Sequence, residues 1–290
     1  MTRVLVLGAN GMLGHDLVGR LSNHEICGMG RSELDITDAS AVDEAVAGRE
    51  VVINAAAYTA VDAAEDDEDL AYAVNADGPR NIASACRHHN ARLIHVSTDY
   101  IFDGSERTPY RETSLGNPRT VYGASKYKGE SAVLEEWSSQ SIILRTSWLY
   151  GIHGQSFPRT ILRAGRELDL LEVVDDKTGQ PTWTRDVVDM IDRLISRDIK
   201  RGIFHGTNSG STTWHGFASA IFEMAGWDTS RVRKTSSDAY VRRALRPAYS
   251  VLGHDNWNSH ELPTPRNWRE ALADAWESGL SEAAQAEAKP

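Results

Sequence analysis

The sequence predicts an α/β fold: a doubly wound parallel sheet followed by a smaller C-terminal domain. Short apolar runs alternate with helical patterns over the first 150 residues, and a glycine-rich turn follows the first run. Strands that alternate with helices form parallel βαβ units. Because the pattern changes after Tyr150, we assign residues 1–150 to the first domain. Residues 151–290 are assigned mainly to the second domain, with some segments returning to the first.

The predicted strands of the sheet are short apolar runs rich in β-branched residues, as is typical of buried parallel strands. They cover residues 4–7, 26–29, 51–53, 93–96 and 142–144. Helical spacing of apolar residues predicts helices between them, over 70–88 and 125–136. Beyond residue 150 the patterns predict helices over 157–168, 186–196 and 213–225, an extended segment over 173–182 and a strand over 203–207. The tail 281–290 is predicted to be frayed.

Three glycines, Gly8, Gly11 and Gly14, directly follow the first predicted strand and open a helical pattern. Glycine permits a tight turn and the close approach of a pyrophosphate, which then lies at the helix N-terminus. The spacing Gly-x-x-Gly-x-x-Gly differs from the Gly-x-Gly-x-x-Gly fingerprint, and an ordinary strand-to-helix turn is the alternative. We interpret the turn as the dinucleotide site of a Rossmann domain that binds a nicotinamide cofactor.

Tyr122 and Lys126 are four residues apart and therefore share one face of a helix. A phenol has an unperturbed pKa near 10, and a nearby lysine charge favours the phenolate, which eases proton exchange with an alcohol or ketone. The hydroxyl of Thr98 could hold the substrate oxygen beside the phenol. With a hydride from the nicotinamide, these residues predict a carbonyl/alcohol redox centre. The alternative is an aromatic that packs at a helix start and a lysine on a solvated face.

Composition excludes several other classes of protein. Lys and Arg number 31 against 41 Asp and Glu, a formal charge of −10, which disfavours nucleic acid as a partner. Cys27 and Cys86 are far apart and lack metal-ligand spacing, so they predict free thiols in a reducing compartment. No apolar run approaches the ~18 residues of a membrane span, and no signal pattern opens the chain. We therefore expect a soluble cytoplasmic protein that does not bind membranes.

Several segments together resemble the extended short-chain dehydrogenases/reductases, and most closely the dTDP-4-dehydrorhamnose reductase family. The resemblance covers nearly the whole chain, and several of the segments are specific to this branch. The segments are residues 8–14, 34–38 (LDITD), 52–62 (VINAAAYTAVD), 96–104 (VSTDYIFDG), 122–126 with Gly129 and Glu130, 145–150 (RTSWLY), 179–182 (GQPT) and 246–250 (RPAYS).

The resemblance implies that the substrate is a nucleotide sugar, dTDP-6-deoxy-L-lyxo-4-hexulose. NADPH would reduce its C4 ketone to give dTDP-L-rhamnose. It implies that Thr98 hydrogen-bonds the C4 oxygen and that Tyr122 protonates it. Lys126 would hold the nicotinamide ribose and lower the pKa of the phenol. The implied sugar contacts are Asp99, Tyr100 and Trp148. The flat apolar faces of Tyr100 and Trp148 suit a deoxyhexose, and ordinary core packing is the alternative for Trp148.

The implied cofactor contacts lie in four segments. Gly11, Met12 and Leu13 lie on the pyrophosphate turn between Gly8 and Gly14. Arg31 follows the second strand about 20 residues after the glycines, where the ribose 2′ position is read. An arginine there favours NADPH, with NADH left open and an exposed turn arginine as the alternative. The adenine contacts would be Asp35 and Ile36, although Asp35 or Asp38 could instead cap the next helix. The ribose and phosphates would meet Ala56, Ala57 and Tyr58.

Some members of the family bridge a dimer through Mg²⁺, with a glutamate of the first helix among the ligands. The matching position here is Asp16, whose side chain is shorter. A hard cation can still use a carboxylate of this kind, but the departure weakens the inference. We therefore assign no metal ligand and leave both Mg²⁺ and a homodimer open.

Two other functions fit the same scaffold. A nucleotide-sugar 4-epimerase or 4,6-dehydratase recycles its cofactor, and related dehydratases carry Asp-Glu after the threonine, where this chain has Asp99-Tyr100. A non-catalytic regulatory subunit would not need Thr98, Tyr122 and Lys126 together. Net consumption of NADPH distinguishes the reductase from both alternatives.

Overall fold

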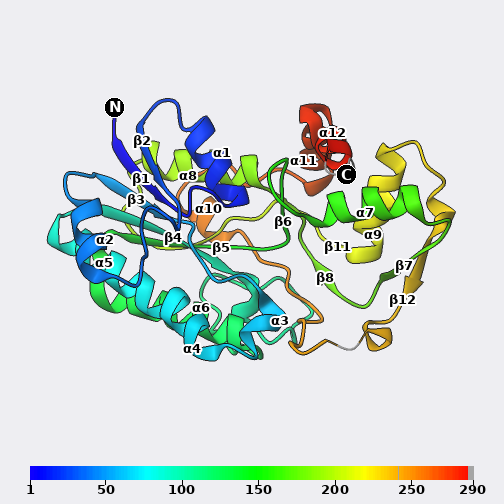
Figure 1. Cartoon of the computed structure of the whole chain (residues 1–290), viewed down its shortest axis with the longest axis horizontal. Helices are drawn as coiled ribbons and strands as arrows, with labels where there is room; N and C mark the ends of the chain where they lie inside the picture. The colour runs from blue at the N-terminus through cyan, green and yellow to red at the C-terminus, as the bar shows by residue number, and fades with distance from the viewer. Residues whose placement is uncertain (241, 287–290) are drawn as a thin grey trace.

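Six parallel strands form the central sheet, in the order β10-β5-β4-β3-β1-β2 (Figure 1). The computed structural model describes residues 1–240 and 242–286. The strands are β1 (Arg3–Leu7), β2 (Glu25–Met29), β3 (Val51–Asn54), β4 (Arg92–Thr98), β5 (Ser141–Thr146) and β10 (Gly202–His205). Each of the five apolar runs predicted within the first 150 residues lies inside one of these strands, so their assignment is confirmed.

Helices cover both faces of the sheet (Figure 1). On one face lie α2 (Ala39–Val46), α5 (Gly78–His88) and α6 (Val121–Trp137), and on the other lie α1 (Met12–Arg20), α8 (Thr184–Ser196) and α10 (Asp255–Ser259). The α1 and α8 helices pack against each other. The doubly wound α/β fold that the sequence predicts is thereby confirmed.

Segments beyond residue 150 contribute both to the sheet and to a second lobe of the molecule. The predicted strand at 203–207 is β10, which pairs in parallel with β5. The apolar side of α8 and the Trp257 indole of α10 belong to the same core as β1 and β3. Segments beyond residue 150 therefore complete the sheet and its core, while a domain boundary at that residue stays a prediction.

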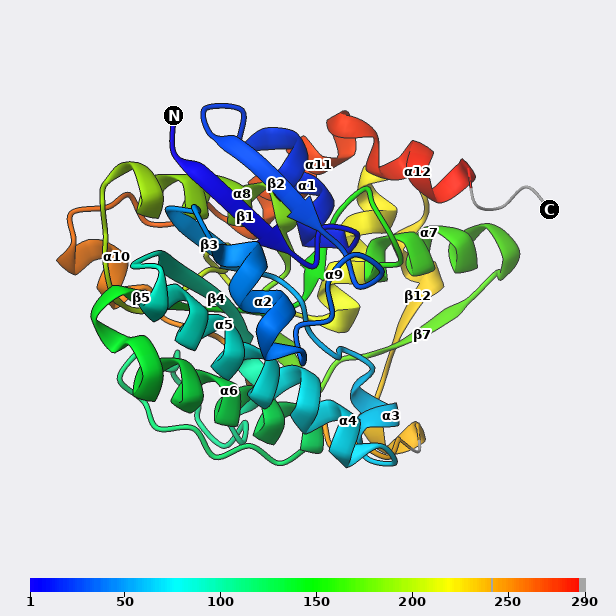
Figure 2. The same cartoon turned by 60° about the vertical axis from the view of Figure 1, so that its left-hand side comes forward.

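The second lobe has its own apolar core of aromatic and aliphatic side chains. Figure 2 shows α7 and α12 of this lobe to one side of the sheet. Its helices are α7 (Phe157–Glu167), α9 (Trp214–Met224), α11 (Trp268–Ala275) and α12 (Ser281–Ala286). Three strand pairs accompany them: β7 (Leu171–Val174) with β12 (Val232–Thr235), β8 (Thr178–Gly179) with β11 (Thr212–Thr213), and β6 (Leu149–Tyr150) with β9 (Thr182–Trp183). The helices and extended segment predicted here are confirmed.

The C-terminal tail differs from its prediction. Residues 281–286 form α12, which packs against α7, so the expected fraying is wrong for this part. Alanine has the highest helix propensity, and the contact with α7 adds tertiary support. The remaining tail residues lie outside the described part of the chain.

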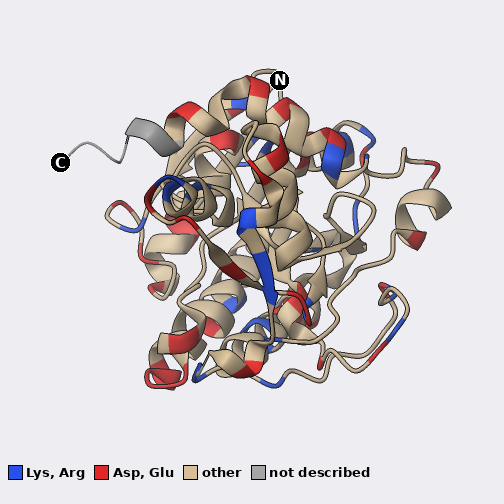
Figure 3. Ribbon diagram, turned by 90° about the vertical axis from the view of Figure 1, so that its right-hand side faces the viewer, with Lys and Arg blue, Asp and Glu red and all other residues tan. Residues whose placement is uncertain are grey.

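Acidic and basic residues are interspersed along the ribbon on the side drawn in Figure 3. Several of them form ion pairs, such as Lys234 with Asp175 at 2.8 Å. Among the residues that the structure describes, no helix is both long enough and apolar enough to cross a membrane.

Candidate active site

The candidate site lies where the strand order of the sheet reverses, between β1 and β3. In doubly wound folds ligands bind outside the carboxyl ends of the strands at this point. The glycine turn follows β1, residues 56–58 follow β3, and Thr98 ends β4. The β5 strand ends at Thr146, which pairs with Thr98, so Trp148 leaves the sheet at the same edge. The topology therefore gathers the predicted residues at one edge.

Two glycines of the turn, Gly8 and Gly14, leave no room for a side chain. Gly8 has φ +81°, and a Cβ on it would lie 2.6 Å from the Ala56 nitrogen of the neighbouring loop. A Cβ on Gly14 would collide with the Gly8 carbonyl. The α1 helix begins at Met12 without a side-chain cap, which leaves backbone N–H groups at its N-terminus for an anion. This arrangement fits the pyrophosphate of a dinucleotide.

The predicted adenosine-side residues have contrasting environments. Arg31 is exposed just beyond β2. Asp35 accepts hydrogen bonds from the backbone and hydroxyl of Thr37, which lower the pKa of its carboxyl. Ile36 packs in the apolar core, where a Cβ on Gly78 would crowd it. The cap of α2 is Asp38, which accepts from two backbone N–H groups, so Asp35 is not needed as a cap.

The loop after β3, with Ala56, Ala57 and Tyr58, is fixed by Asn75. The Asn75 side chain accepts from the Tyr58 nitrogen at 2.8 Å and donates to the Tyr58 carbonyl at 3.0 Å and to the Ser125 hydroxyl at 3.1 Å. Asn75 lies in a π-helical turn, Ala73–Asp77, a feature that often marks functional sites. Sequence reasoning missed Asn75, because a polar residue within a helical pattern gave no separate signal.

Thr98 and Tyr122 meet at the centre of the site. The Thr98 hydroxyl accepts from the Tyr100 nitrogen at 3.2 Å and donates to Asp99 Oδ1 at 3.2 Å, and it acts on the neighbouring Tyr122 phenol, whose pKa it lowers. Thr120 caps α6 by accepting from the Gly123 nitrogen at 3.0 Å, which places Tyr122 in the first helical turn. The rings of Tyr100 and Tyr122 meet edge-on, with centroids 5.5 Å apart. Tyr122 therefore has a fixed position beside the Thr98 hydroxyl.

The electrostatic environment keeps the Tyr122 phenol protonated. Burial raises its pKa to about 12; the bond from Thr98 lowers the pKa, and the charge of Asp99 raises it. Asp99 is itself buried, which raises the pKa of its carboxyl to about 6. At neutral pH the pair is therefore mainly a carboxylate beside a neutral phenol, which can donate a proton.

Lys126 is buried rather than solvated, so the solvated-face alternative is wrong. Its side chain is 2% exposed, and its ammonium donates to the Val96 carbonyl at 2.7 Å. Burial lowers the pKa of Lys126 to about 8, although the charge of Glu130 raises it. The expected lowering of the Tyr122 pKa by Lys126 is not found, because burial of the phenol dominates.

Trp148 combines backbone strain with aromatic stacking. Its φ of +44° is rare for a bulky residue and is a feature that clusters at functional sites. The indole stacks on Trp214 with ring centroids 3.5 Å apart and 10° between the planes, and Gly179 packs against the ring. Trp148 is therefore a supported platform at the sheet edge. Sequence reasoning missed Trp214, which lies at the first position of α9.

A paired arginine and carboxylate bridges the two lobes beside the site. Arg246 donates to both carboxylate oxygens of Asp62, at 2.5 and 2.6 Å. These bonds lower the pKa of Asp62 to about 2. The charge of Arg246 also acts on Tyr100, whose phenol it favours in the ionised form. The segment around Arg246 is thereby tied to α3 (Val61–Ala64) and to one of the predicted sugar contacts.

Comparison with known proteins identifies the family of the chain. Residues 1–280 match the model of the RmlD substrate binding domain family. The chain belongs to this family. It is 46% identical over 282 residues to the dTDP-4-dehydrorhamnose reductase of Streptomyces griseus, covering 94% of this chain and 93% of that one. It is 43% identical to the dTDP-4-keto-6-deoxy-D-glucose reductase of Streptomyces niveus, covering 94% and 96%.

A solved structure of a family member contains the cofactor. The dTDP-4-dehydrorhamnose reductase of Bacillus anthracis, in complex with NADP, superposes with a TM-score of 0.92 at 37% identity, covering 96% of this chain and 100% of that one. The predicted family, fold and oxidoreductase class are confirmed for this family member.

Asp16, the position considered for a metal ligand, is engaged within the chain. The Thr184 hydroxyl donates to one of its oxygens at 2.5 Å, and the Arg185 guanidinium lies 3.6 Å from the other. A neighbouring guanidinium repels a cation. The residues around Asp16 therefore do not fit Mg²⁺, and we derive no step through a metal.

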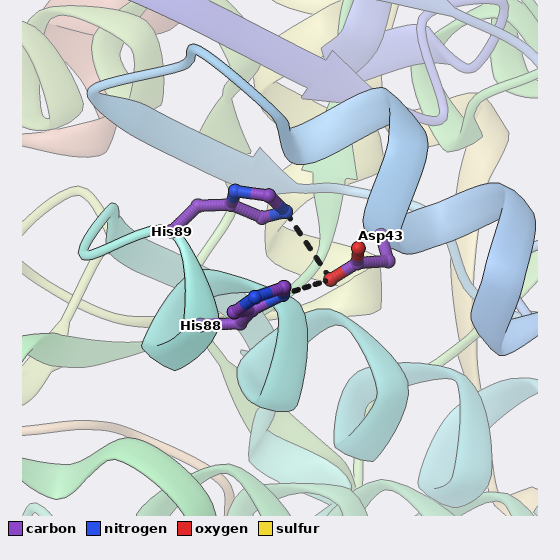
Figure 4. Close-up of side chains that lie close together, drawn as sticks. All are labelled: Asp43, His88 and His89. Atoms are coloured by element: carbon purple, nitrogen blue, oxygen red, sulfur yellow. Dashed lines mark hydrogen bonds and ion pairs between the residues drawn. The ribbon is translucent and has the colours of Figure 1, made fainter.

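One group of side chains with metal-ligating atoms lies away from the site, on α2 and at the end of α5 (Figure 4). An oxygen of Asp43 is 2.9 Å from His88 Nδ1 and 3.2 Å from His89 Nε2. These contacts lower the pKa of the Asp43 carboxyl. A hydrogen bond between the Asp43 carboxylate and His88, with His89 in ion-pair range, accounts for the arrangement.

Proposed function

We propose that this family member uses NADPH to reduce the C4 ketone of dTDP-6-deoxy-L-lyxo-4-hexulose to dTDP-L-rhamnose. The observation that carries the proposal is the placement of Tyr122 in the first turn of α6, beside Thr98 and one helical turn before the buried Lys126. Family membership and the name of the Streptomyces griseus relative support the substrate. The protein binds a nucleotide sugar and not nucleic acid; it acts in the cytoplasm, and a homodimer is compatible with the site.

The glycine turn and the N-terminus of α1 would hold the cofactor pyrophosphate, and Arg31 would pair with the 2′-phosphate. The adenosine and the ribose would contact Asp35, Ile36, Ala56, Ala57 and Tyr58. When bound, NADPH supplies the hydride. Lys126 would donate to the hydroxyls of the nicotinamide ribose.

The sugar lies with its C4 oxygen between Thr98 and Tyr122. As the carbonyl is reduced, negative charge develops on this oxygen, and the Thr98 hydroxyl stabilises it. Tyr122 then donates its proton, because an alkoxide is a stronger base than a phenolate. Tyr100 and Trp148 contact the apolar faces of the deoxyhexose, and Asp99 binds its hydroxyl groups.

A second candidate substrate differs in the sugar and not in the reaction. The Streptomyces niveus relative is named a reductase of dTDP-4-keto-6-deoxy-D-glucose, whose C4 ketone could meet the same Thr98 and Tyr122. The two sugars differ in ring stereochemistry, which Tyr100 and Trp148 would read. Comparing kcat/KM for both 4-keto sugars decides between them.

The decisive assay incubates the pure protein with the 4-keto sugar and NADPH carrying deuterium at the transferred position. Deuterium at C4 with one NADPH oxidised per sugar is the expected result. Product formed without net loss of NADPH would instead indicate an epimerase-like cycle. Binding of cofactor without turnover of any 4-keto sugar would indicate a regulatory subunit.

A further inference from the structure

A buried row of polar side chains leads from the loop after β3 to Lys126. The Ala56 nitrogen donates to Asn54 Oδ1 at 3.0 Å, and Asn54 Nδ2 lies 3.0 Å from His95 Nδ1. His95 Nε2 lies 3.5 Å from Lys126 Nζ. Asn54 and His95 are both 0% exposed. Buried polar groups of this kind are costly unless each is paired.

The contacts determine which nitrogen of His95 carries the proton. A backbone N–H only donates, so the Asn54 oxygen faces Ala56 and the Asn54 amide NH₂ faces His95. His95 Nδ1 must then accept, and a neutral imidazole carries its proton on Nε2. Burial and the charge of Lys126 hold the pKa of His95 well below its ordinary value. The Nε2–H group of a neutral His95 therefore points at Lys126.

An N–H donor affects the two forms of Lys126 differently. An ammonium has three donors and no acceptor, whereas a neutral amine has a lone pair that can accept from His95 Nε2–H. The Val96 carbonyl accepts from either form. We propose that His95 is a positioning residue. Asn54 holds the His95 ring, and His95 Nε2–H fixes the Lys126 amine and promotes release of the Lys126 proton. The inference rests on the proposed function, in which Lys126 holds the nicotinamide ribose.

Other groups around Lys126 do not replace this role. On its own helix, α6, lie Tyr122 and Glu130. The Glu130 carboxylate is paired with Arg145 of β5, at 3.0 Å from Nε and 2.8 Å from Nη2. Asp99, beyond β4, acts on Tyr122. His95 is thus an uncharged side chain that places a hydrogen-bond donor against the Lys126 amine.

The row also connects two parts of the proposed site. Ala56 belongs to the loop predicted to line the cofactor, and Asn54 ends the strand before it. A substitution of His95 should therefore change the pKa of Lys126 without altering the positions of Thr98 and Tyr122. This expectation separates a positioning role from general damage to the fold.

The test uses His95→Asn, whose amide can still accept from Asn54 but places no donor at Lys126. We expect the alkaline limb of the kcat/KM profile, near the pKa of about 8 of Lys126, to move upward by about one pH unit. One hydrogen bond corresponds to about a tenfold change in proton affinity. His95→Gln reaches Lys126 with an amide oxygen that accepts from an ammonium, so its limb should move upward at least as far.

The matched control is His205→Asn, because His205 is another fully buried histidine, on β10, whose Nδ1 lies 2.8 Å from the Gly253 carbonyl. The alkaline limb of the kcat/KM profile of His205→Asn should stay at the wild-type pH. The pH dependence of NADPH binding, followed by cofactor fluorescence, provides a second readout that needs no sugar. If the protein reduces no 4-keto sugar but the His95 variants still shift the pH dependence of NADPH binding, the proposed reaction is rejected and the role of His95 is not. Wild-type limbs and binding curves in both folded His95 variants, or an equal shift in the control, would overturn the role of His95.

Discussion

The two sides of the site are built differently. At the end of β4, Thr98, Tyr122 and Lys126 are buried or half-buried and hydrogen-bonded to neighbours. Beyond β1 and β2, the glycine turn offers backbone groups, and Arg31 is exposed. The first side adjusts proton affinities by removing water. The second side recognises shape and charge, so changes there should alter cofactor affinity more than the chemical step.

The largest effect is expected for Tyr122→Phe. Phenylalanine keeps the edge-on contact with Tyr100 but removes the proton donor. General acid catalysis contributes typically 10²–10⁴-fold, and kcat should fall by about that factor. Stopped-flow NADPH oxidation measures the rate, and fluorescence titration should give an unchanged Kd for NADPH. Near-normal reduction by the variant would remove Tyr122 from the mechanism.

Thr98→Val should have the next largest effect. Valine keeps the shape of the side chain but deletes the hydroxyl that stabilises the developing alkoxide. A donor of this kind contributes about 2.7–4 kcal/mol, so kcat should fall roughly 10²–10³-fold. The matched control is Thr146→Val, on the strand position paired with Thr98, because the Thr146 hydroxyl is buried without a hydrogen-bond partner among the described residues. Equal losses in the two variants would mean that packing, and not the hydroxyl, matters.

Arg31→Ala tests the cofactor side. A charge-assisted contact with the 2′-phosphate contributes roughly 1.5–3 kcal/mol, so the Kd for NADPH should rise by about one to two decades. The Kd for NADH should change little, because NADH lacks this phosphate. Calorimetric titration of both cofactors provides the comparison. If the affinities for NADPH and NADH fall together, Arg31 contacts a group that both cofactors share or supports the loop after β2.

The difference between the two sides also explains which features of the site could be predicted from the amino-acid sequence. The glycine turn and the strand runs are local features, and they lie where the sequence predicts them. The environment of Lys126 depends on Val96 and His95 from a strand about thirty residues away, so helical spacing alone suggested a different effect on Tyr122. Likewise, the support of Trp148 by Trp214 joins segments of two lobes, which no local pattern predicts.

Asp62→Asn should have the smallest effect, because the Asp62–Arg246 pair lies beside the site at a partly exposed position, with the carboxylate 39% exposed. The pKa of Asp62 is depressed to about 2, so its stabilising contribution is complete above the unfolded pKa of 3.8 and is lost as pH falls through about 2. Since solvent screens the pair, we expect the free energy of unfolding at neutral pH to fall by about 1 kcal/mol or less.

Urea unfolding of the wild type and Asp62→Asn measures this difference, and high salt should reduce it. The control is Asp66→Asn, which removes the more exposed ion pair with Arg243 and should change stability less. If Asp62→Asn also lowers kcat, the bridge to Arg246 acts on the site through Tyr100, whose phenol feels the charge of Arg246. An unchanged kcat with a small stability loss would show that the bridge holds the lobes together without adjusting the catalytic side.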